Sequence, residues 1–210
     1  MVKNMIDCIR GIDKNECPND CSFKYRESRI VKIPPPNRIE GVIISRDPPN
    51  AWSHFYEYAS TIPQEETKRK VLFAGGIPLK LVDRIMRFKE GNISSDKKHH
   101  LFDWMFQRTY WTHFHKCFTD EAQEDTKFKE KNGKNCANCW LKKELKINTK
   151  DRIVVALGKH VEKWVKGMDE FKELKIIYLP HPSGQNASWY DREKYNDIKD
   201  SIEDLLKAIN

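Results

Sequence analysis

Short apolar runs alternate with longer amphipathic stretches along this 210-residue chain. Four runs are rich in β-branched and aromatic residues and predict strands: residues 39–46, 109–116, 152–158 and 174–179. Apolar residues at helical spacing predict helices over residues 51–60, 79–86, 101–107, 136–145 and 195–209. Strands that are separated by helices favour a parallel sheet with both faces covered. We therefore expect an α/β fold, a three-layer α/β/α sandwich with a central, mostly parallel sheet.

Polar stretches separate these elements. A proline run at residues 34–36 precedes the first strand, residues 91–100 predict a loop, and the charged residues 119–134 predict an exposed insertion that is closed by Asn132-Gly133. The length suits one good-sized hydrophobic core. We expect a single domain over residues 1–210, with a cysteine-bearing amino-terminal segment, residues 1–29, packed on it.

Polar residues stand at the ends of three predicted strands. Asp47 follows the first strand, His113 lies near the end of the second, and His181 follows the last. In an open parallel α/β sheet, ligands bind at the carboxyl ends of the strands, so these side chains are expected at one crevice. A carboxylate can activate water and an imidazole can stabilise an anion, which is what hydrolysis needs. A structural, proline-rich turn is the alternative interpretation of the His181 loop.

Charge favours a polyanionic partner. The chain has 38 lysine and arginine residues against 31 aspartate and glutamate residues, a net charge of +7. This excess indicates nucleic acid, and the candidates for a basic face are Lys97, Lys98 and residues 127–134. We find neither an apolar run of about 18 residues nor the apolar core of a signal peptide. We expect a soluble, intracellular protein with no membrane partner, cytoplasmic or, in a eukaryote, nuclear.

The six cysteines form two groups, one amino-terminal and one central: Cys8, Cys17 and Cys21, then Cys117, Cys136 and Cys139. In a reducing compartment, clustered thiols indicate metal or redox chemistry more than disulfides. Buried structural cysteine is the alternative, and it suits Cys8 best.

These motifs resemble the uracil-DNA glycosylase superfamily. The similar segments are Asp47-Pro48 after a hydrophobic strand, residues 154–158, and His181-Pro182-Ser183 after the last strand. The cysteine spacing resembles the iron–sulfur, family 4-like branch. This resemblance implies a [4Fe–4S] cluster whose ligands are Cys17, Cys21, Cys117 and Cys139, with Cys136 as the competing fourth ligand. A structural zinc ion is the alternative, since four thiolates suit it equally well.

The resemblance also implies a function. It suggests a monomeric DNA repair glycosylase that flips a deaminated or damaged base, uracil or a related base, out of DNA and hydrolyses its N-glycosidic bond. Asp47 would orient the water, and His181 would donate a hydrogen bond to the departing base. The implied base-binding residues are Phe73, His113, Arg46 and Pro48. The implied DNA-binding residues are Ser183, Gly184, Gln185, Asn186 and Trp189.

The chain departs from the family pattern at several positions. Ser45 and Pro49 flank the first motif where the classical pattern has other residues, and Cys17 and Cys21 are separated by one residue more than usual. His113 stands where many members place an Asn that reads the uracil edge, so the preferred base stays open. One alternative is a non-catalytic nucleic-acid-binding protein with a metal-stapled fold. Another is a hydrolase of free nucleosides or nucleotides, with little salt dependence.

Overall fold

The computed structural model describes residues 21, 33, 35–36, 38–48, 76–88, 95–122, 124, 127–148, 152–183, 186–191 and 195–209. The helix that we expected over residues 51–60 lies outside this part of the chain. So do several candidate site residues: Cys8, Cys17, Phe73, Gly184 and Gln185.

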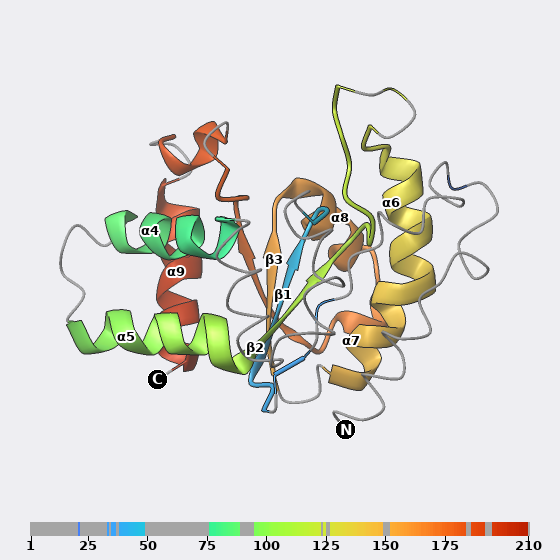
Figure 1. The fold of residues 1–210 in the computed structure, drawn as a ribbon. Helices are drawn as coiled ribbons and strands as arrows, with labels where there is room; N and C mark the ends of the chain where they lie inside the picture. The colour runs from blue at the N-terminus through green and yellow to red at the C-terminus, as the bar shows by residue number, and fades with distance from the viewer. Residues whose placement is uncertain are drawn as a thin grey trace, which may run out of the picture.

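The centre of the fold is a four-stranded parallel sheet in the order β2-β1-β3-β4. Its strands are β1 (Gly41–Ser45), β2 (Thr109–His113), β3 (Ile153–Leu157) and β4 (Lys175–Leu179). β1 pairs with β2 on one side and with β3 on the other, and all its residues are buried. The arrowheads in Figure 1 point the same way, so the carboxyl ends of the strands form one edge.

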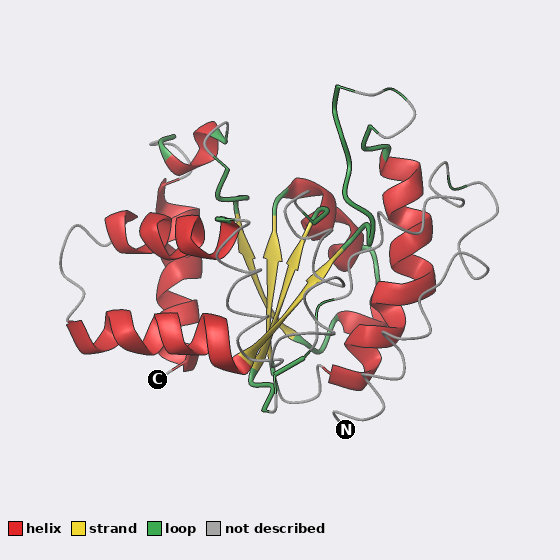
Figure 2. Cartoon of the chain, in the orientation of Figure 1, coloured by secondary structure: helices red, strands yellow, loops and turns green. Residues whose placement is uncertain are grey.

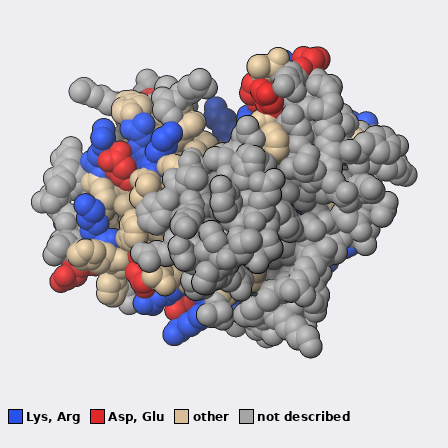
Figure 3. All heavy atoms as spheres, viewed as in Figure 1, with Lys and Arg blue, Asp and Glu red and all other residues tan. Residues whose placement is uncertain are grey.

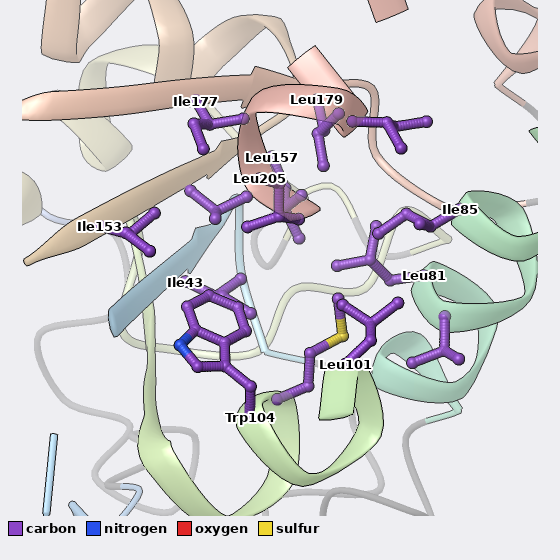
Figure 4. Close-up of a cluster of buried hydrophobic side chains, with 14 of the residues drawn as sticks. Ile43, Leu81, Ile85, Leu101, Trp104, Ile153, Leu157, Ile177, Leu179 and Leu205 are labelled. Carbon is purple, nitrogen blue, oxygen red and sulfur yellow. The ribbon is translucent and has the colours of Figure 1, made fainter. Parts of the chain in front are cut away.

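Helices cover both faces of this sheet (Figures 1 and 2). One face carries α4 (Ile77–Phe88), α5 (Ser95–Asp103) and α9 (Tyr195–Ile209), and the other carries α6 (Glu130–Cys136), α7 (Lys142–Asn148) and α8 (Lys159–Lys166). Alternate strand residues face opposite layers, as the pleat requires. Ile43 packs with Leu81 and Leu101 from the first layer (Figure 4), and Ile44 packs with residues of the second. The expected three-layer sandwich is therefore confirmed.

Three segments differ from the sequence-based expectation. Residues 95–100, which we expected within a loop, form the first part of α5. They are polar and, from residue 96, exposed, so no apolar periodicity marks them as helical. The buried side chain of Leu101 anchors the helix to the core. β2 ends at His113, three residues before the end that we expected, residue 116.

The predicted insertion at residues 119–134 is the third difference. Helix α6 begins at Glu130 and runs through a π-helical segment, Ala137–Leu141, into α7. Asn132 and Gly133 are buried inside this helix and do not form a turn. A Cβ atom on Gly133 would lie 2.4 Å from Phe114 Cε1, so glycine here lets the helix press onto the aromatic ring. Within the described residues, no helix combines the length and apolarity that crossing a membrane requires.

Candidate active site

A cleft of about 500 Å³ lies at the carboxyl edge of the sheet. Asp47 and Pro48 line it from the end of β1, Gly158 from the end of β3, and His181 and Ser183 from the end of β4. Gly158 has a φ angle of 86°. An L side chain rarely adopts this conformation, so glycine suits the sharp turn from β3 into α8. The structure thus brings Asp47 and His181 together, as we predicted from the strand ends.

The carboxylate of Asp47 is held at both oxygen atoms. Arg46 Nε donates a hydrogen bond to Oδ1, and Thr119 Oγ1 donates one to Oδ2. Arg46 also donates to Glu121 Oε1 over 3.1 Å, and its guanidinium carbon lies 4.6 Å from the centre of the Phe128 ring. The carboxylate side chain is 11% exposed, so it is fixed in orientation yet reaches the cleft.

His181 is oriented by its own loop. The backbone N–H of Ser183 donates to His181 Nδ1 over 3.3 Å, which leaves the proton of the neutral ring on Nε2. Burial lowers the pKa of His181 below 6.5, although the neighbouring Asp47 carboxylate acts in the opposite direction. The imidazole is therefore a neutral N–H donor at pH 7.

Two side chains that follow His181 in the chain form hydrogen bonds with its backbone. The backbone carbonyl of His181 accepts hydrogen bonds from Asn186 Nδ2 over 3.2 Å and from Trp189 Nε1 over 3.0 Å. Trp189 is 6% exposed and packs edge-on against Phe88, with ring centres 6.0 Å apart. We expected Trp189 to contact DNA, but the structure places its ring in the core. Asn186 lines the cleft as well as holding the carbonyl.

His113 occupies the last position of β2 and is 1% exposed. Burial lowers its pKa well below 6.5, and electrostatic interactions with Lys116, His181 and His115 act in the same direction. His113 is therefore a neutral, buried neighbour of His181. It is not among the described residues that line the cleft.

Sequence reasoning missed two residues around Asp47. His115 is 1% exposed, and burial lowers its pKa to about 4 despite the opposing effect of Asp47. In the strand that we expected over residues 109–116, the spacing of His113 and His115 was a usable signal, because residues two apart in a strand share a face. Thr119 lies in a loop where no local pattern marks it.

The cysteines of the two sequence groups also meet. Cys21, Cys117 and Cys136 are buried together with Trp140, and Cys139 packs against this cysteine cluster at its edge. The backbone N–H of Lys116 donates to Cys136 Sγ over 3.3 Å. No disulfide joins these four cysteines. Among the described residues, no group of three or more His, Cys, Asp or Glu side chains is arranged to hold a metal ion.

A buried ion pair lies next to the cysteine cluster. Lys116 Nζ lies 2.7 Å from Glu144 Oε2, and Thr112 Oγ1 donates to the same oxygen over 2.6 Å. The exposed fractions of the Lys116 and Glu144 side chains are 4% and 1%. This pair joins the end of β2 to α7.

Basic side chains in one of the two segments that we expected to form a basic face lie close to acidic side chains. In the segment 127–134, Lys127 and Lys129 lie within 3.8 Å of Glu124, and Lys134 lies 2.9 Å from Glu130. Figure 3 shows basic side chains gathered over α4 and acidic ones at the tip of the loop before α6. The α4 side of the molecule is thus the better candidate for contact with a polyanion.

Comparison with known protein families gives one result. The family model of the uracil DNA glycosylase superfamily matches residues 59–206. This range includes His113, Cys117 and His181, while Cys21 and Asp47 precede it. A search of curated proteins gave no match.

Proposed function

The chain belongs to the uracil DNA glycosylase superfamily, and we propose that it is a DNA repair glycosylase. Its substrate is a deaminated or damaged base, uracil or a related base, which it flips out of DNA and releases by hydrolysis of the N-glycosidic bond, leaving an abasic site. The observation that carries this proposal is the meeting of Asp47 and His181 in one cleft at the carboxyl edge of the sheet.

Asp47 is the residue that orients the attacking water. Its carboxylate is fixed by Arg46 and Thr119, which leaves further lone pairs on both oxygens for a water molecule in the cleft. Its negative charge also stabilises the positive charge that develops on the sugar as the glycosidic bond breaks. Arg46 thus positions the carboxylate, and both Arg46 and Pro48 line the space into which a base would enter.

His181 stabilises the departing base. Because Nδ1 accepts the Ser183 N–H, the proton on Nε2 is available to the negative charge that develops on the base. Ser183 therefore acts here by holding the imidazole, and its side chain lines the same cleft.

Recognition of the base involves residues whose roles we also propose. Phe73, which precedes the described segment 76–88, would stack on the flipped base, as the resemblance implies. His113 would act close to His181, in place of an Asn. A neutral imidazole presents its donor and acceptor on opposite edges, so it suits a different base edge from the one that Asn reads.

We further propose that the cysteine cluster holds a [4Fe–4S] cluster, which would pin the amino-terminal segment to the central helix. Two features fit this group. Four cysteines from distant segments pack together, and the buried Trp140 Nε1 beside them has no hydrogen-bond partner among the described residues. The ligands would be Cys17, Cys21, Cys117 and Cys136 or Cys139. Cys136 Sγ accepts a hydrogen bond from the backbone N–H of Lys116, which favours Cys136 as the fourth ligand, because such hydrogen bonds stabilise thiolate ligands.

The function is tested with DNA duplexes that contain uracil, hypoxanthine, xanthine or a mismatched thymine, followed by alkaline cleavage at abasic sites. We expect the wild-type protein to excise at least one base and Asp47→Asn to lose about 10²–10³ in rate. Asp169→Asn is the matched control, because Asp169 is an exposed carboxylate in the turn after α8. DNA binding without excision of any base, unchanged by Asp47→Asn, would support the non-catalytic alternative instead.

The cofactor is tested by visible absorption and by metal analysis of the purified protein. Broad visible absorption together with bound iron is the expected result. A colourless protein with stoichiometric zinc would replace the iron–sulfur proposal with a structural zinc site.

A further inference from the structure

Tyr190 is an exposed aromatic residue in the segment that follows the cleft residues His181, Ser183 and Asn186. Its exposed fraction is 64%, and among the described residues Leu79 is the other large exposed hydrophobic residue. Tyr190 directly follows the short 3-10 turn Ala187–Trp189. Because Trp189 in this turn donates its indole N–H to the His181 carbonyl, the position of Tyr190 is tied to that of the catalytic histidine.

A cation from the neighbouring helix holds the tyrosine ring. Arg84 of α4 donates a hydrogen bond to the Tyr190 hydroxyl, and its guanidinium carbon lies 4.8 Å from the centre of the ring. Lys80, one turn earlier on α4, is close enough for its charge to contribute to the lowered pKa of His181. The first residue of α4, Ile77, lines the cleft. One exposed ring and two cations therefore stand together at this side of the cleft.

The charge on the two sides of the cleft differs. On the far side, Glu121 lines the cleft and Glu124 lies in the same loop, and Figure 3 shows acidic side chains at this tip. A polyanion is therefore attracted more strongly to the α4 side than to the other. An exposed aromatic ring flanked by cations is the combination that binds nucleic acid, since bases stack on the ring and phosphates pair with the cations.

We propose that Tyr190 and Arg84 form a binding site for the nucleotide next to the one whose base enters the cleft. Its base stacks on the Tyr190 ring, and Arg84 and Lys80 bind the neighbouring phosphates. This inference rests on the proposed function, because it takes DNA as the substrate. It assigns to Tyr190 the DNA contact that the sequence suggested for Trp189.

The experiment measures binding of the full-length protein to a duplex with an abasic site next to 2-aminopurine, a fluorescent base that stacking quenches. Loss of one stacked base costs about 1–3 kcal/mol, so we expect Tyr190→Ala to weaken binding by about 5- to 150-fold and to abolish the quenching. Tyr190→Trp should retain both. Because the side chain is exposed, Tyr190→Ala should leave the melting temperature unchanged.

Arg84→Gln provides an independent measurement. We expect it to weaken binding and to reduce the slope of log Kd against log salt by about 0.9, the value for one lost phosphate contact. Arg87→Gln is the matched control, because Arg87 is on the same helix but pairs with Asp83 at 3.0 Å. It should retain wild-type affinity.

The two proposals fail in different ways. If Tyr190→Ala retains wild-type affinity and quenching, the stacking site is wrong, whether or not the wild-type protein excises a base. If the wild-type protein excises no base but Tyr190→Ala still weakens binding, the stacking site stands and the glycosylase proposal fails.

Discussion

The cleft and the region next to the cysteine cluster each contain an ion pair, but the two ion pairs differ in burial. Each has a basic side chain paired with a glutamate: Arg46 with Glu121 over 3.1 Å, and Lys116 with Glu144 over 2.7 Å. The first pair is 36% and 55% exposed, whereas the second is 4% and 1% exposed. Water screens the first pair, so its charges separate at little cost, while the second pair cannot separate without leaving a buried charge.

The cleft therefore has an ion pair that can separate, and the region of the cysteine cluster has one that cannot separate without a large cost in free energy. Residues 113–117 connect the two regions. His115 is electrostatically coupled to Asp47 in the cleft. Lys116 meets both Glu144 and Cys136. The buried Lys116–Glu144 pair therefore fixes the segment that carries His113 and His115.

The largest effect is expected from breaking the buried pair. Glu144→Ala leaves the Lys116 ammonium buried and should lower the free energy of unfolding by about 3–5 kcal/mol. Glu121→Ala removes the exposed partner and should lower it by less than about 1 kcal/mol. Urea denaturation of both variants measures the contrast. Equal effects at the two sites would show that burial does not distinguish the two regions.

The next largest effect is a loss of activity with little loss of stability. His181→Ala removes the N–H donor from the cleft and should reduce the excision rate about 10²–10³-fold. The urea midpoint should fall much less than in Glu144→Ala, because the hydrogen bonds from Asn186 and Trp189 go to the backbone carbonyl of His181. The control is His100→Ala, an exposed histidine on α5. An equal loss of excision rate in His100→Ala would contradict the proposed role of His181 in the cleft.

The predictable part of this protein consists of its strands. The runs that became β1, β3 and β4 are short and apolar, and parallel strands must end at one edge of the sheet. That rule alone places Asp47 and His181 together, before any side chain is seen. The meeting of the two cysteine groups could also be anticipated, because their spacing resembles a known arrangement.

The missed features depend on partners that are distant in sequence. Glu144 looks like an ordinary polar residue of an amphipathic helix, and only the fold brings it to Lys116. Asn132-Gly133 has the composition of a turn, yet Gly133 lies in a helix because its missing side chain makes room for Phe114. Thr119 gains its importance from a single hydrogen bond across the cleft. Local pattern carries no information about such contacts.

A smaller effect is expected from that hydrogen bond. Thr119→Val keeps the shape of the side chain but removes the hydroxyl that donates to Asp47 Oδ2. A hydrogen bond to a charged group contributes about 1.5–3 kcal/mol when it is buried, and this one is partly solvated, so we expect about a tenfold loss of excision rate. Thr119→Ser should restore most of it. If Thr119→Val excises at the wild-type rate, Thr119 does not position the carboxylate.

The smallest effect is the contribution of His181 to the pH dependence of stability. Burial lowers its pKa in the folded protein below the 6.5 of an exposed histidine, so between these two values the unfolded chain binds a proton that the folded protein does not. The free energy of unfolding therefore falls as the pH drops from 6.5 through the lowered pKa. Urea denaturation at pH 7.5 and pH 5.5 measures this fall, which should be smaller in His181→Ala than in the wild type. His100→Ala should show the wild-type fall, because that side chain is exposed. If the free energy of unfolding of His181→Ala falls as much as that of the wild type, the more deeply buried His113 and His115 account for the whole pH dependence. Protonation of His181 then does not contribute to the stability.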